Sequence, residues 1–571
     1  MAYDILIKGG TVIDGTGLPG FPADIGVSDG RIAAIGDLSG EAADEIIDAD
    51  GHVVAPGFVD GHTHMDAQIF WDHIGRNSCW HGVTSVVMGN CGFTLAPCAA
   101  DEKDLVLHNF ERAEDIPPEA MNAGIPWSWT SFTEYMDALD ALPKGMNYAG
   151  YVGHSALRTH VMGKRAMEET ATPEDMEAMK ESLREAMQAG ALGLSTSRTQ
   201  AHRTPEGMPV ASRLSSWEEF CELVDVLREL DCGIVQMARE NIIQDPVKRA
   251  DEHARVKALA LKSGRPFTFG SSWSKRNQPD VWRDQFKMVD ETNAEGGKML
   301  IQATATWNGS LRSFETMTPY DYIPVWKEFR ELPLEEQEAG LRDPEMRKKL
   351  VDAVNAHTHK PDPALPNAFQ RAVDWDWVFP LTQPLPPHPS LADIAKERGV
   401  EPIDAFIDLA LENHLKIFFV QPSNNEDQDF VLALIRHPHS VVTFSDSGAH
   451  VATTINPIHG HLLGHWVRDK NALTLEAAIR KITFDLASFW GLKERGWLHE
   501  GYHADIVIFD PDTIAPSMPT LLHDLPAGAP RIDQKATGIM ATIVNGQVFI
   551  RDNEHTGAHP GQLLRGEMAQ N

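Results

Sequence analysis

Two histidines stand two residues apart directly after a short apolar run, in residues 57–64 (Gly-Phe-Val-Asp-Gly-His-Thr-His). If that run is a β-strand, alternation along it points the imidazoles of His62 and His64 to the same face. Two neutral imidazoles on one face provide half of the ligand set of a metal site. The alternative is a pair of ordinary loop histidines, so further ligands must be sought elsewhere in the chain.

A thiol and a carboxylate follow later apolar runs in the same way. Cys91 ends one run among glycines (Val-Val-Met-Gly-Asn-Cys-Gly), and Asp446 ends another (Val-Val-Thr-Phe-Ser-Asp). Taken alone, a buried cysteine is commonly inert and an aspartate after a strand is a common helix cap. Together with the two histidines they predict the metal ligands His62, His64, Cys91 and Asp446, with Asp446 also acting as a general base.

The elements that must position these residues alternate between short apolar runs and helical patterns, which is typical of βαβ units and a parallel sheet. The candidate strands are residues 58–62, 85–91, 147–154, 192–197, 234–237, 267–271, 299–304, 417–421 and 441–446. We leave out 417–421, because it follows a long Pro-rich region and a (β/α)8 barrel has places for eight strands. The predicted class is α/β, with a distorted (β/α)8 TIM-like barrel whose strand ends carry the chemistry.

The two ends of the chain share a different pattern, short alternating strands separated by Gly-rich turns. We predict that residues 1–57 and 497–571 form a small β-sandwich domain and that residues 58–496 form the barrel. The irregular stretch at roughly 310–415 is interpreted as an insertion, which would form a lid over the site or a contact between subunits.

Composition excludes several classes of partner. The chain has 571 residues and a formal net charge of −32, which repels nucleic acid phosphates. No apolar stretch approaches the roughly 18 residues of a membrane helix, and the N-terminus lacks a secretory pattern. The five cysteines lack the paired spacing of a disulfide framework. We expect a cytoplasmic protein with reduced thiols and a small-molecule substrate, without nucleic acid or membrane partners, and we leave a homo-oligomer open.

Several motifs together resemble the D-aminoacylase branch of the amidohydrolase superfamily. They are the segments 57–64, 89–92 (Gly-Asn-Cys-Gly), 153–158 (Gly-His-Ser-Ala-Leu-Arg), 445–446 and 495–511, spread over nearly the whole chain. The resemblance implies a distorted barrel with a β sandwich from both termini, and zinc-dependent hydrolysis of N-acyl-D-amino acids. It also implies that His62, His64, Cys91 and Asp446 occupy the metal and catalytic positions.

Two positions depart from that family pattern. The family has metal-binding histidines where this chain has Gln236 and where Phe-Gly-Ser-Ser stands around Ser271. Two ligands of the family's tight zinc site are therefore missing. Of one or two divalent ions, we expect one, most readily zinc.

Other polar residues near the predicted strand ends are candidates for binding substrate: His154, Arg198, His202 and His450. Arg158 is a further candidate to stabilise an oxyanion, and Lys275 is the lysine nearest a strand end. His459, His461 and His465 are better explained as surface or packing histidines, although the last two share a helical face.

The expected reaction is hydrolysis of an amide, as in an N-acyl amino acid, by a metal-activated water. Hydrolysis of a cyclic amide or an ester on the same scaffold is the alternative enzyme, and a non-catalytic scaffold or binding protein is the alternative of another class. The family has a substrate-binding arginine soon after the matching aspartate, but here the first one is Arg468. We therefore expect a bulkier or less charged amide packed against Trp273 or Trp307, unless Arg198 replaces the missing arginine.

Overall fold

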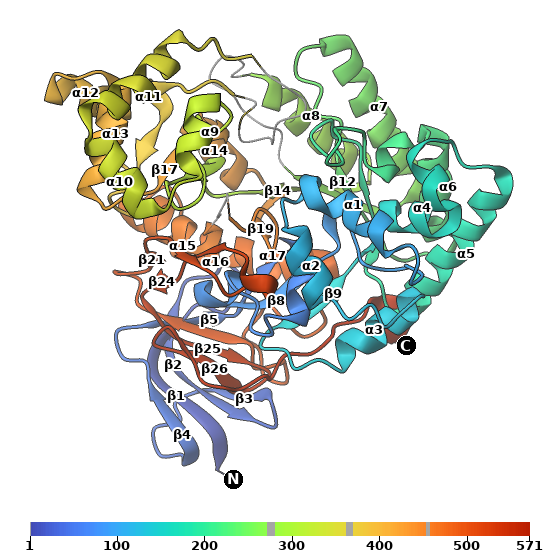
Figure 1. Ribbon diagram of the computed structural model, residues 1–571. Coiled ribbons are helices and arrows are strands. Elements are labelled where there is room, and N and C mark those ends of the chain that lie inside the picture. The colour runs from blue at the N-terminus through green and yellow to red at the C-terminus, as the bar shows by residue number, and fades with distance from the viewer. Residues whose placement is uncertain (1, 271–279, 361–368, 370, 453–456, 571) are drawn as a thin grey trace.

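The computed structural model describes residues 2–270, 280–360, 369, 371–452 and 457–570. It is a mixed α/β protein, which confirms the predicted class. In Figure 1 the strands of the two termini lie at the bottom, the barrel region fills the centre and right, and the insertion lies at the upper left.

Parallel strands run through the middle of the chain. They are β6 (Phe58–Asp60), β7 (His62–Thr63), β8 (Val83–Met88), β9 (Asn147–Gly150), β10 (Val152–Gly153), β11 (Gly193–Ser197), β12 (Ile234–Ala238), β13 (Pro266–Gly270), β14 (Lys298–Ala303), β18 (Ser440–Val442) and β19 (Phe444–Ser447). Pairing links β6, β8 and β9 in one sheet, links β10 to β14 and β18 in a second, and joins β19 to β7. Single residues separate β6 from β7, β9 from β10 and β18 from β19. If each of these pairs counts as one strand, the pairing order follows the chain and then returns from the last strand to the first. A (β/α)8 barrel has this order.

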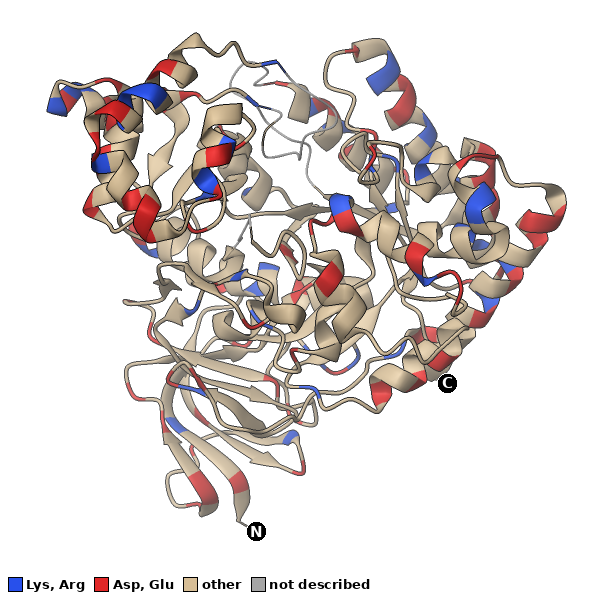
Figure 2. Cartoon of the chain, in the orientation of Figure 1, with Lys and Arg blue, Asp and Glu red and all other residues tan. Residues whose placement is uncertain are grey.

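Helices separate these strands and cover their outer side. The longer ones are α1 (Lys103–Ala113), α3 (Phe132–Asp140), α4 (His154–Met162), α5 (Pro173–Ala189), α6 (Trp217–Glu229), α7 (Pro246–Ser263), α8 (Val281–Ala294), α14 (Gln428–Arg436), α16 (Leu475–Ile482) and α17 (Phe484–Trp490). Helix α5 begins with a reciprocal capping box between Thr172 and Asp175, and Pro173 takes its first helical position. Figure 2 shows charged residues gathered on outer helices such as α5 and α6, which bury their apolar side chains on the other face.

The insertion has a hydrophobic core of its own. Its elements are β15 (Asn308–Arg312), α9 (Pro324–Arg330), α10 (Leu334–Arg342), α11 (Pro344–Ala356), β16 (Phe379–Pro380), α12 (Leu391–Arg398), α13 (Pro402–Glu412) and β17 (Phe419–Asn424). Side chains such as Trp326, Leu350 and Phe406 form this core, which is separate from the core beneath the barrel helices. The omission of 417–421 from the barrel is confirmed, because β17 pairs antiparallel with β15 and β16.

Strands from both termini share one sheet. It joins β1 (Tyr3–Val12), β2 (Phe21–Ser28), β3 (Arg31–Gly36), β4 (Ala43–Asp48) and β5 (Val53–Pro56) with β20 (Ile506–Phe509), β25 (Ile539–Val544), β26 (Gln547–Arg551) and β27 (Glu554–His555). Not every residue after 497 belongs to this sheet. Short pairs β21/β24 (Ala515–Pro516, Ala536–Thr537) and β22/β23 (Thr520–Leu522, Arg531–Asp533) stand apart from it, and Arg531 pairs with Asp72 of the barrel region. The domain boundaries at 57 and 497 stay a prediction.

Buried polar contacts attach the terminal sheet to the barrel strands. Asp505 pairs with Arg495 and accepts hydrogen bonds from Asn147 at the start of β9 and from the backbone of Asn545. Such a buried carboxylate is stable only while all its partners stay in place. None of the described helices is both long and apolar enough to cross a membrane.

The close approach of β11 and β12 provides a test of the strand order. Gly193 begins β11 with a φ of +151°, and a Cβ there would lie 2.0 Å from the carbonyl oxygen of Ile234. We expect Gly193→Ala to lower the free energy of unfolding by about 2 kcal/mol or more, because neither backbone can retreat without breaking the ladder. Chemical denaturation measures this effect.

Gly150→Ala is the matched control at the end of β9. Its added Cβ would meet only ordinary contacts, the nearest at 3.5 Å, and its φ is not in the left-handed region. Equal stability of the two variants would contradict the described packing of β11 on β12.

Candidate metal centre

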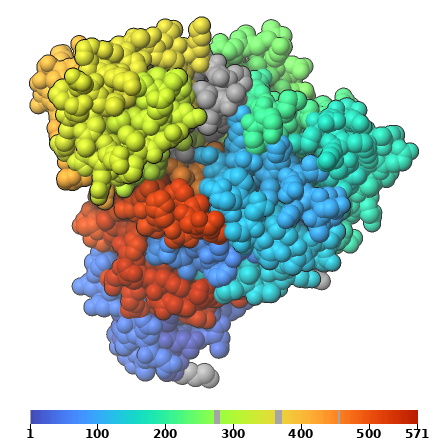
Figure 3. Space-filling model, viewed as in Figure 1, coloured from blue at the N-terminus to red at the C-terminus, as the bar shows by residue number. Residues whose placement is uncertain are grey.

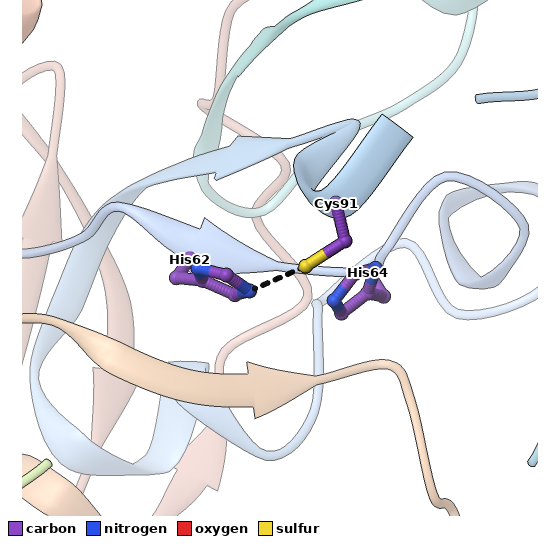
Figure 4. A group of neighbouring side chains, drawn as sticks. All are labelled: His62, His64 and Cys91. Carbon is purple, nitrogen blue, oxygen red and sulfur yellow. Dashed lines mark hydrogen bonds between the residues drawn. The ribbon is translucent and has the colours of Figure 1, made fainter. Parts of the chain in front are cut away.

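The two histidines of the first strand face one interior point, as alternation predicts. His62 lies in β7 and His64 follows it, and both side chains are 1% exposed. Nδ1 of His62 donates to Oε1 of Gln302 in β14 at 2.6 Å, which leaves Nε2 as the nitrogen with a free lone pair. Figure 4 shows Nε2 of His62 and the ring of His64 on either side of the Cys91 sulfur.

Cys91 is held beside these imidazoles by an unusual backbone. It lies in the 3-10 helix η3 (Asn90–Gly92) after β8, with a φ of +58°. Its N–H donates to Oε1 of Gln236 at 2.7 Å, and its Sγ lies 3.5 Å from Nε2 of His62. Gln236, at a position where the family resemblance implies a histidine, therefore fixes the backbone of the cysteine.

Asp446 reaches the same point from β19. Its Oδ1 lies 3.3 Å from Nε2 of His62 and 3.6 Å from Nε2 of His64. Its φ of +54° is again left-handed, a conformation that Asp and Asn adopt more readily than most residues. Pairing of β19 with β7 brings this carboxylate to the histidines.

The donor atoms have the spacing that a small divalent cation requires. Bonds of about 2.0–2.3 Å to a tetrahedral zinc ion place neighbouring ligand atoms about 3.3–3.7 Å apart. The separations of Nε2 of His62 from the Cys91 sulfur and from Asp446 are 3.5 and 3.3 Å. His62, His64 and Cys91 also form a group of mutually close ligand atoms. These residues fit zinc in both atom type and spacing.

Glu114 joins the cluster although sequence analysis did not find it. This residue follows α1, is 2% exposed, and places Oε2 at 3.4 Å from Nε2 of His64. Its other oxygen, Oε1, is buried with no hydrogen-bond partner among the described residues. No pattern in the sequence marks Glu114, because it stands at the end of a helix and not at the end of a strand.

The acids of the cluster favour a positive charge at its centre. Burial acts to lower the pKa of His64, but Glu114, Asp446 and Cys91 outweigh it and hold that pKa well above its ordinary value. Burial would likewise raise the pKa of Asp446, yet its contacts with His64 and His62 lower it to about 2. Burial lowers the pKa of His62 to about 4, so this ring is neutral as a ligand must be.

Burial raises the pKa of the Cys91 thiol to about 11, although His64 opposes this shift. A thiol in such surroundings keeps its proton until a cation takes that proton's place. Burial also raises the pKa of the Glu114 carboxyl.

Two of the predicted substrate-binding residues lie at the cluster. His202, in the loop after β11, groups with Cys91 and Glu114, and burial lowers its pKa to about 3. His450 has a φ of +51°, and its backbone N–H donates to the carbonyl of Glu114 at 2.6 Å. His202 and His450 are therefore near the predicted chemistry.

Two other candidates, His154 and Arg158, bind side chains away from the cluster. His154 begins α4 instead of ending a strand, and its ring donates or accepts at both nitrogens, with Thr196 at 3.0 Å and Glu219 at 2.9 Å. Arg158 is fully buried and pairs with the same Glu219. Both residues serve packing between α4 and α6, which gives no support to their proposed contact with substrate or oxyanion.

Arg198 is also held by the protein. Its Nε donates to Glu240 at 3.1 Å, and its guanidinium lies over the ring of Trp217. It does not stand ready as a replacement carboxylate clamp. His461 and His465 are buried with ring centroids 5.0 Å apart, and His459 stacks on Phe58, in keeping with packing roles. Ser271, Trp273 and Lys275 lie outside the described residues.

A cavity of about 630 Å³ opens beside the cluster. Asp115, Ala201 and His450 line it, and the first two are the chain neighbours of Glu114 and His202. The opposite wall comes from β15, β17 and Arg371 of the insertion. Figure 3 shows the insertion as a yellow lobe above the red C-terminal segment. The insertion therefore forms one wall of this cavity, and its role as a lid or a contact between subunits stays a prediction.

Three arginine side chains line this cavity, and the sequence alone did not place them there. They are Arg112, Arg312 and Arg371, and the acidic residues Glu111 and Asp115 also line the cavity. Burial lowers the pKa of Arg312 to about 10, which leaves its guanidinium charged at neutral pH. Arg371 pairs with the buried Glu426. The sequence shows no motif around these arginines. Two of them lie in the insertion, which has no recognisable strand-end pattern.

Comparison with known proteins places the whole chain in one family. Residues 45–550 match the model of the amidohydrolase family. The chain is 30% identical to a D-aminoacylase of Alcaligenes xylosoxydans xylosoxydans, covering 98% of this chain and 97% of the relative. This chain belongs to the amidohydrolase family.

Two solved structures have the same fold over their full lengths. A D-aminoacylase structure concerned with a binuclear metal centre is 26% identical with a TM-score of 0.67, covering 99% of this chain and 100% of that one. The N-acyl-D-glutamate deacylase of Bordetella bronchiseptica, in complex with zinc and a phosphonate that mimics the tetrahedral intermediate, is 25% identical with a TM-score of 0.66 and the same coverage. The predicted family resemblance is confirmed.

The hydrogen bond from His62 to Gln302 makes a first test of the centre. In Gln302→Ala the imidazole loses the partner that fixes its tautomer and orientation, so we expect zinc affinity to fall about 10- to 100-fold. Competition with a chromophoric chelator measures this affinity.

Gln285→Ala is the control, since Gln285 is also a buried glutamine but belongs to helix α8. If Gln302→Ala and the wild type bind zinc equally well, Gln302 does not orient a metal ligand.

Proposed function

We propose that this protein is a metal-dependent hydrolase that cleaves the amide bond of an N-acyl amino acid. The observation that carries the proposal is the close group of His62, His64 and Cys91, with Oδ1 of Asp446 at 3.3 and 3.6 Å from Nε2 of the two histidines, near a cavity. Membership of the amidohydrolase family and full-length similarity to a D-aminoacylase and an N-acyl-D-glutamate deacylase support the type of bond.

His62, His64, Cys91 and Asp446 would hold the cation. A divalent ion held there would supply Lewis-acid chemistry, lowering the pKa of water from about 15.7 towards 7 and polarising a carbonyl. Asp446, whose pKa lies far below neutrality, is present as the carboxylate that accepts the proton of the attacking water. It then donates that proton to the leaving nitrogen as the carbon–nitrogen bond breaks.

Surrounding residues keep this geometry without touching the substrate. Gln302 fixes the tautomer of His62, and Gln236 fixes the backbone of Cys91. A non-catalytic scaffold would have no use for this convergence of imidazoles, thiol and carboxylate near a cavity, so an enzyme is the better explanation. Hydrolysis of a cyclic amide or an ester uses the same groups and stays the alternative reaction.

The cavity changes the expectation about substrate charge. Absence of an arginine soon after Asp446 predicted a less charged amide, but Arg312 and its neighbours place positive charge in the cavity wall. A charge-assisted hydrogen bond to a carboxylate contributes about 1.5–3 kcal/mol. We therefore propose that the free carboxylate of the N-acyl amino acid lies towards Arg312.

Asp446→Asn tests the assigned base. Asparagine tolerates the left-handed backbone and keeps the size of the side chain, but it cannot accept the proton. We expect turnover to fall about 10²- to 10⁴-fold with little change in the thermal midpoint. Turnover of a series of N-acyl amino acids, measured with metal content, gives the answer; near-normal rates at unchanged metal content would remove Asp446 from its role.

Matched substrates test the role of Arg312. We expect the wild type to favour an N-acyl amino acid over its carboxamide by about tenfold or more in kcat/KM, and Arg312→Met to bring this ratio towards one. Arg342→Met is the control, because Arg342 pairs with Glu338 on α10 and does not line the cavity. A wild-type preference for the carboxamide would show that the first expectation of an uncharged substrate was right.

A further inference from the structure

Three histidines lie together where the Pro-rich segment of the insertion, residues 379–389, meets helix α15 (Ile458–His461) and the π-helix η8 (Leu462–Asp469) that continues it. His388 belongs to the Pro-rich segment, His461 ends α15, and His465 lies in η8. A π-helix is rare in proteins and often marks a functional site.

Contacts between the two segments bring the three rings near one another. The side chain of Leu385 covers Gly464, where an added Cβ would lie 3.0 Å from Cδ1 of the leucine. His461 and His465 have ring centroids 5.0 Å apart and are each 4% exposed. A positive charge on His465 would lower the pKa of His388, and a charge on either ring would lower the pKa of His461. The three imidazoles therefore interact across the contact.

Each ring has one enclosed nitrogen without a partner. Nδ1 of His388, Nε2 of His461 and Nδ1 of His465 are buried and make no hydrogen bond within the described part of the chain. Buried polar atoms are nearly always satisfied, and the exceptions call for an explanation such as a bound water or ion. Packing explains why the faces of these rings are buried, but it gives no use to three such nitrogens in one place.

These imidazoles are in the protonation state that a metal ligand needs. Burial lowers the pKa of His388 to about 4, and it also lowers the pKa values of His461 and His465. The rings are therefore uncharged at neutral pH, and each can offer a lone pair. Asp469, whose charge opposes this shift at His465, already pairs with Arg468 at 2.8 Å.

The spacing of His461 and His465 fits two imidazoles on one ion. A bond of about 2.0–2.1 Å places the centre of an imidazole ring about 3.2 Å from the metal, so two rings at a tetrahedral angle have centres about 5 Å apart. The observed separation is 5.0 Å. His388 packs on Trp307 with ring centroids 5.5 Å apart, and it is partly exposed, which gives an ion a path from solvent.

We infer that His388, His461 and His465 bind a divalent transition-metal ion, separate from the candidate metal centre, that fastens the Pro-rich segment to η8. Three imidazoles suit zinc, cobalt, nickel or copper and leave one coordination position for water. Strand β16 of this segment pairs with β17, whose residues line the cavity beside the candidate centre. A bound ion would therefore hold one wall of that cavity in place.

Cobalt distinguishes this site from the candidate metal centre by its spectrum. The centre contains the Cys91 thiol, so Co²⁺ bound there gives thiolate-to-metal absorption, whereas a site of imidazoles gives only the weaker d–d bands. The full-length protein is stripped with a chelator and titrated with Co²⁺, and bound metal is counted after equilibrium dialysis. We expect one equivalent per chain that adds d–d bands without thiolate absorption.

His388→Asn, His461→Asn and His465→Asn should each abolish this equivalent or raise its dissociation constant at least tenfold, and leave the thiolate absorption unchanged. His459→Asn is the matched control: His459 lies in α15, is 2% exposed and has Nε2 3.4 Å from the carbonyl oxygen of Val59. It should keep the equivalent. The partly exposed position of His388 allows its variant to fold even if a buried replacement does not.

Hydrogen exchange gives a second readout. Saturation with Co²⁺ should slow amide exchange in residues 379–389 about tenfold in the wild type, because the ion joins this segment to η8. The same addition should leave exchange there unchanged in His465→Asn, in which the candidate centre is intact.

Absence of a thiolate-free equivalent in the wild type, or an unchanged dissociation constant for it in any of the three variants, would overturn the inference. The wild-type count stands even if a variant fails to fold. Hydrolysis of N-acyl amino acids by a protein that lacks this equivalent would remove the histidine site and leave the proposed function in place. A bound histidine-site ion without hydrolysis of any amide would do the reverse.

Discussion

The pairing of β7 with β19 is the contact on which the rest of the site depends. His62 stands opposite Phe444, and the N–H of His64 donates to the carbonyl of Ser447 at 2.7 Å. These bonds join the first and last parallel strands, so two histidines and a carboxylate from distant parts of the chain face one point. A Cβ on Gly448 would lie 2.5 Å from the carbonyl oxygen of His64, so this approach depends on glycine.

Backbone strain accompanies this convergence. Cys91, Asp446 and His450 all have positive φ, a conformation that costs about 1–3 kcal/mol for a residue other than glycine. Regular strands would continue straight past the cluster, whereas these turns direct a thiol, a carboxylate and an imidazole towards it. The buried strands and their covering helices hold the strained residues in place.

The local charge around the candidate site differs from the net charge of the whole chain. The net charge of −32 disfavours contact with nucleic acid phosphates but says nothing about the cavity, where Arg112, Arg312 and Arg371 stand near two acidic residues. At the cluster, buried acids raise the pKa of His64 and so favour a cation. Local fields of this kind depend on which side chains the fold brings together.

The sequence by itself determined the α/β class and the omission of 417–421, and it predicted the four central ligands, because strand periodicity and strand ends are local features. It did not locate Glu114 at a helix end, Gln302 within β14, or the arginines of the insertion. It also assigned His154 to the substrate, although Glu219, distant in sequence, already binds its ring. Only the tertiary structure decided these roles, since a side chain's partner depends on contacts between segments far apart in the chain.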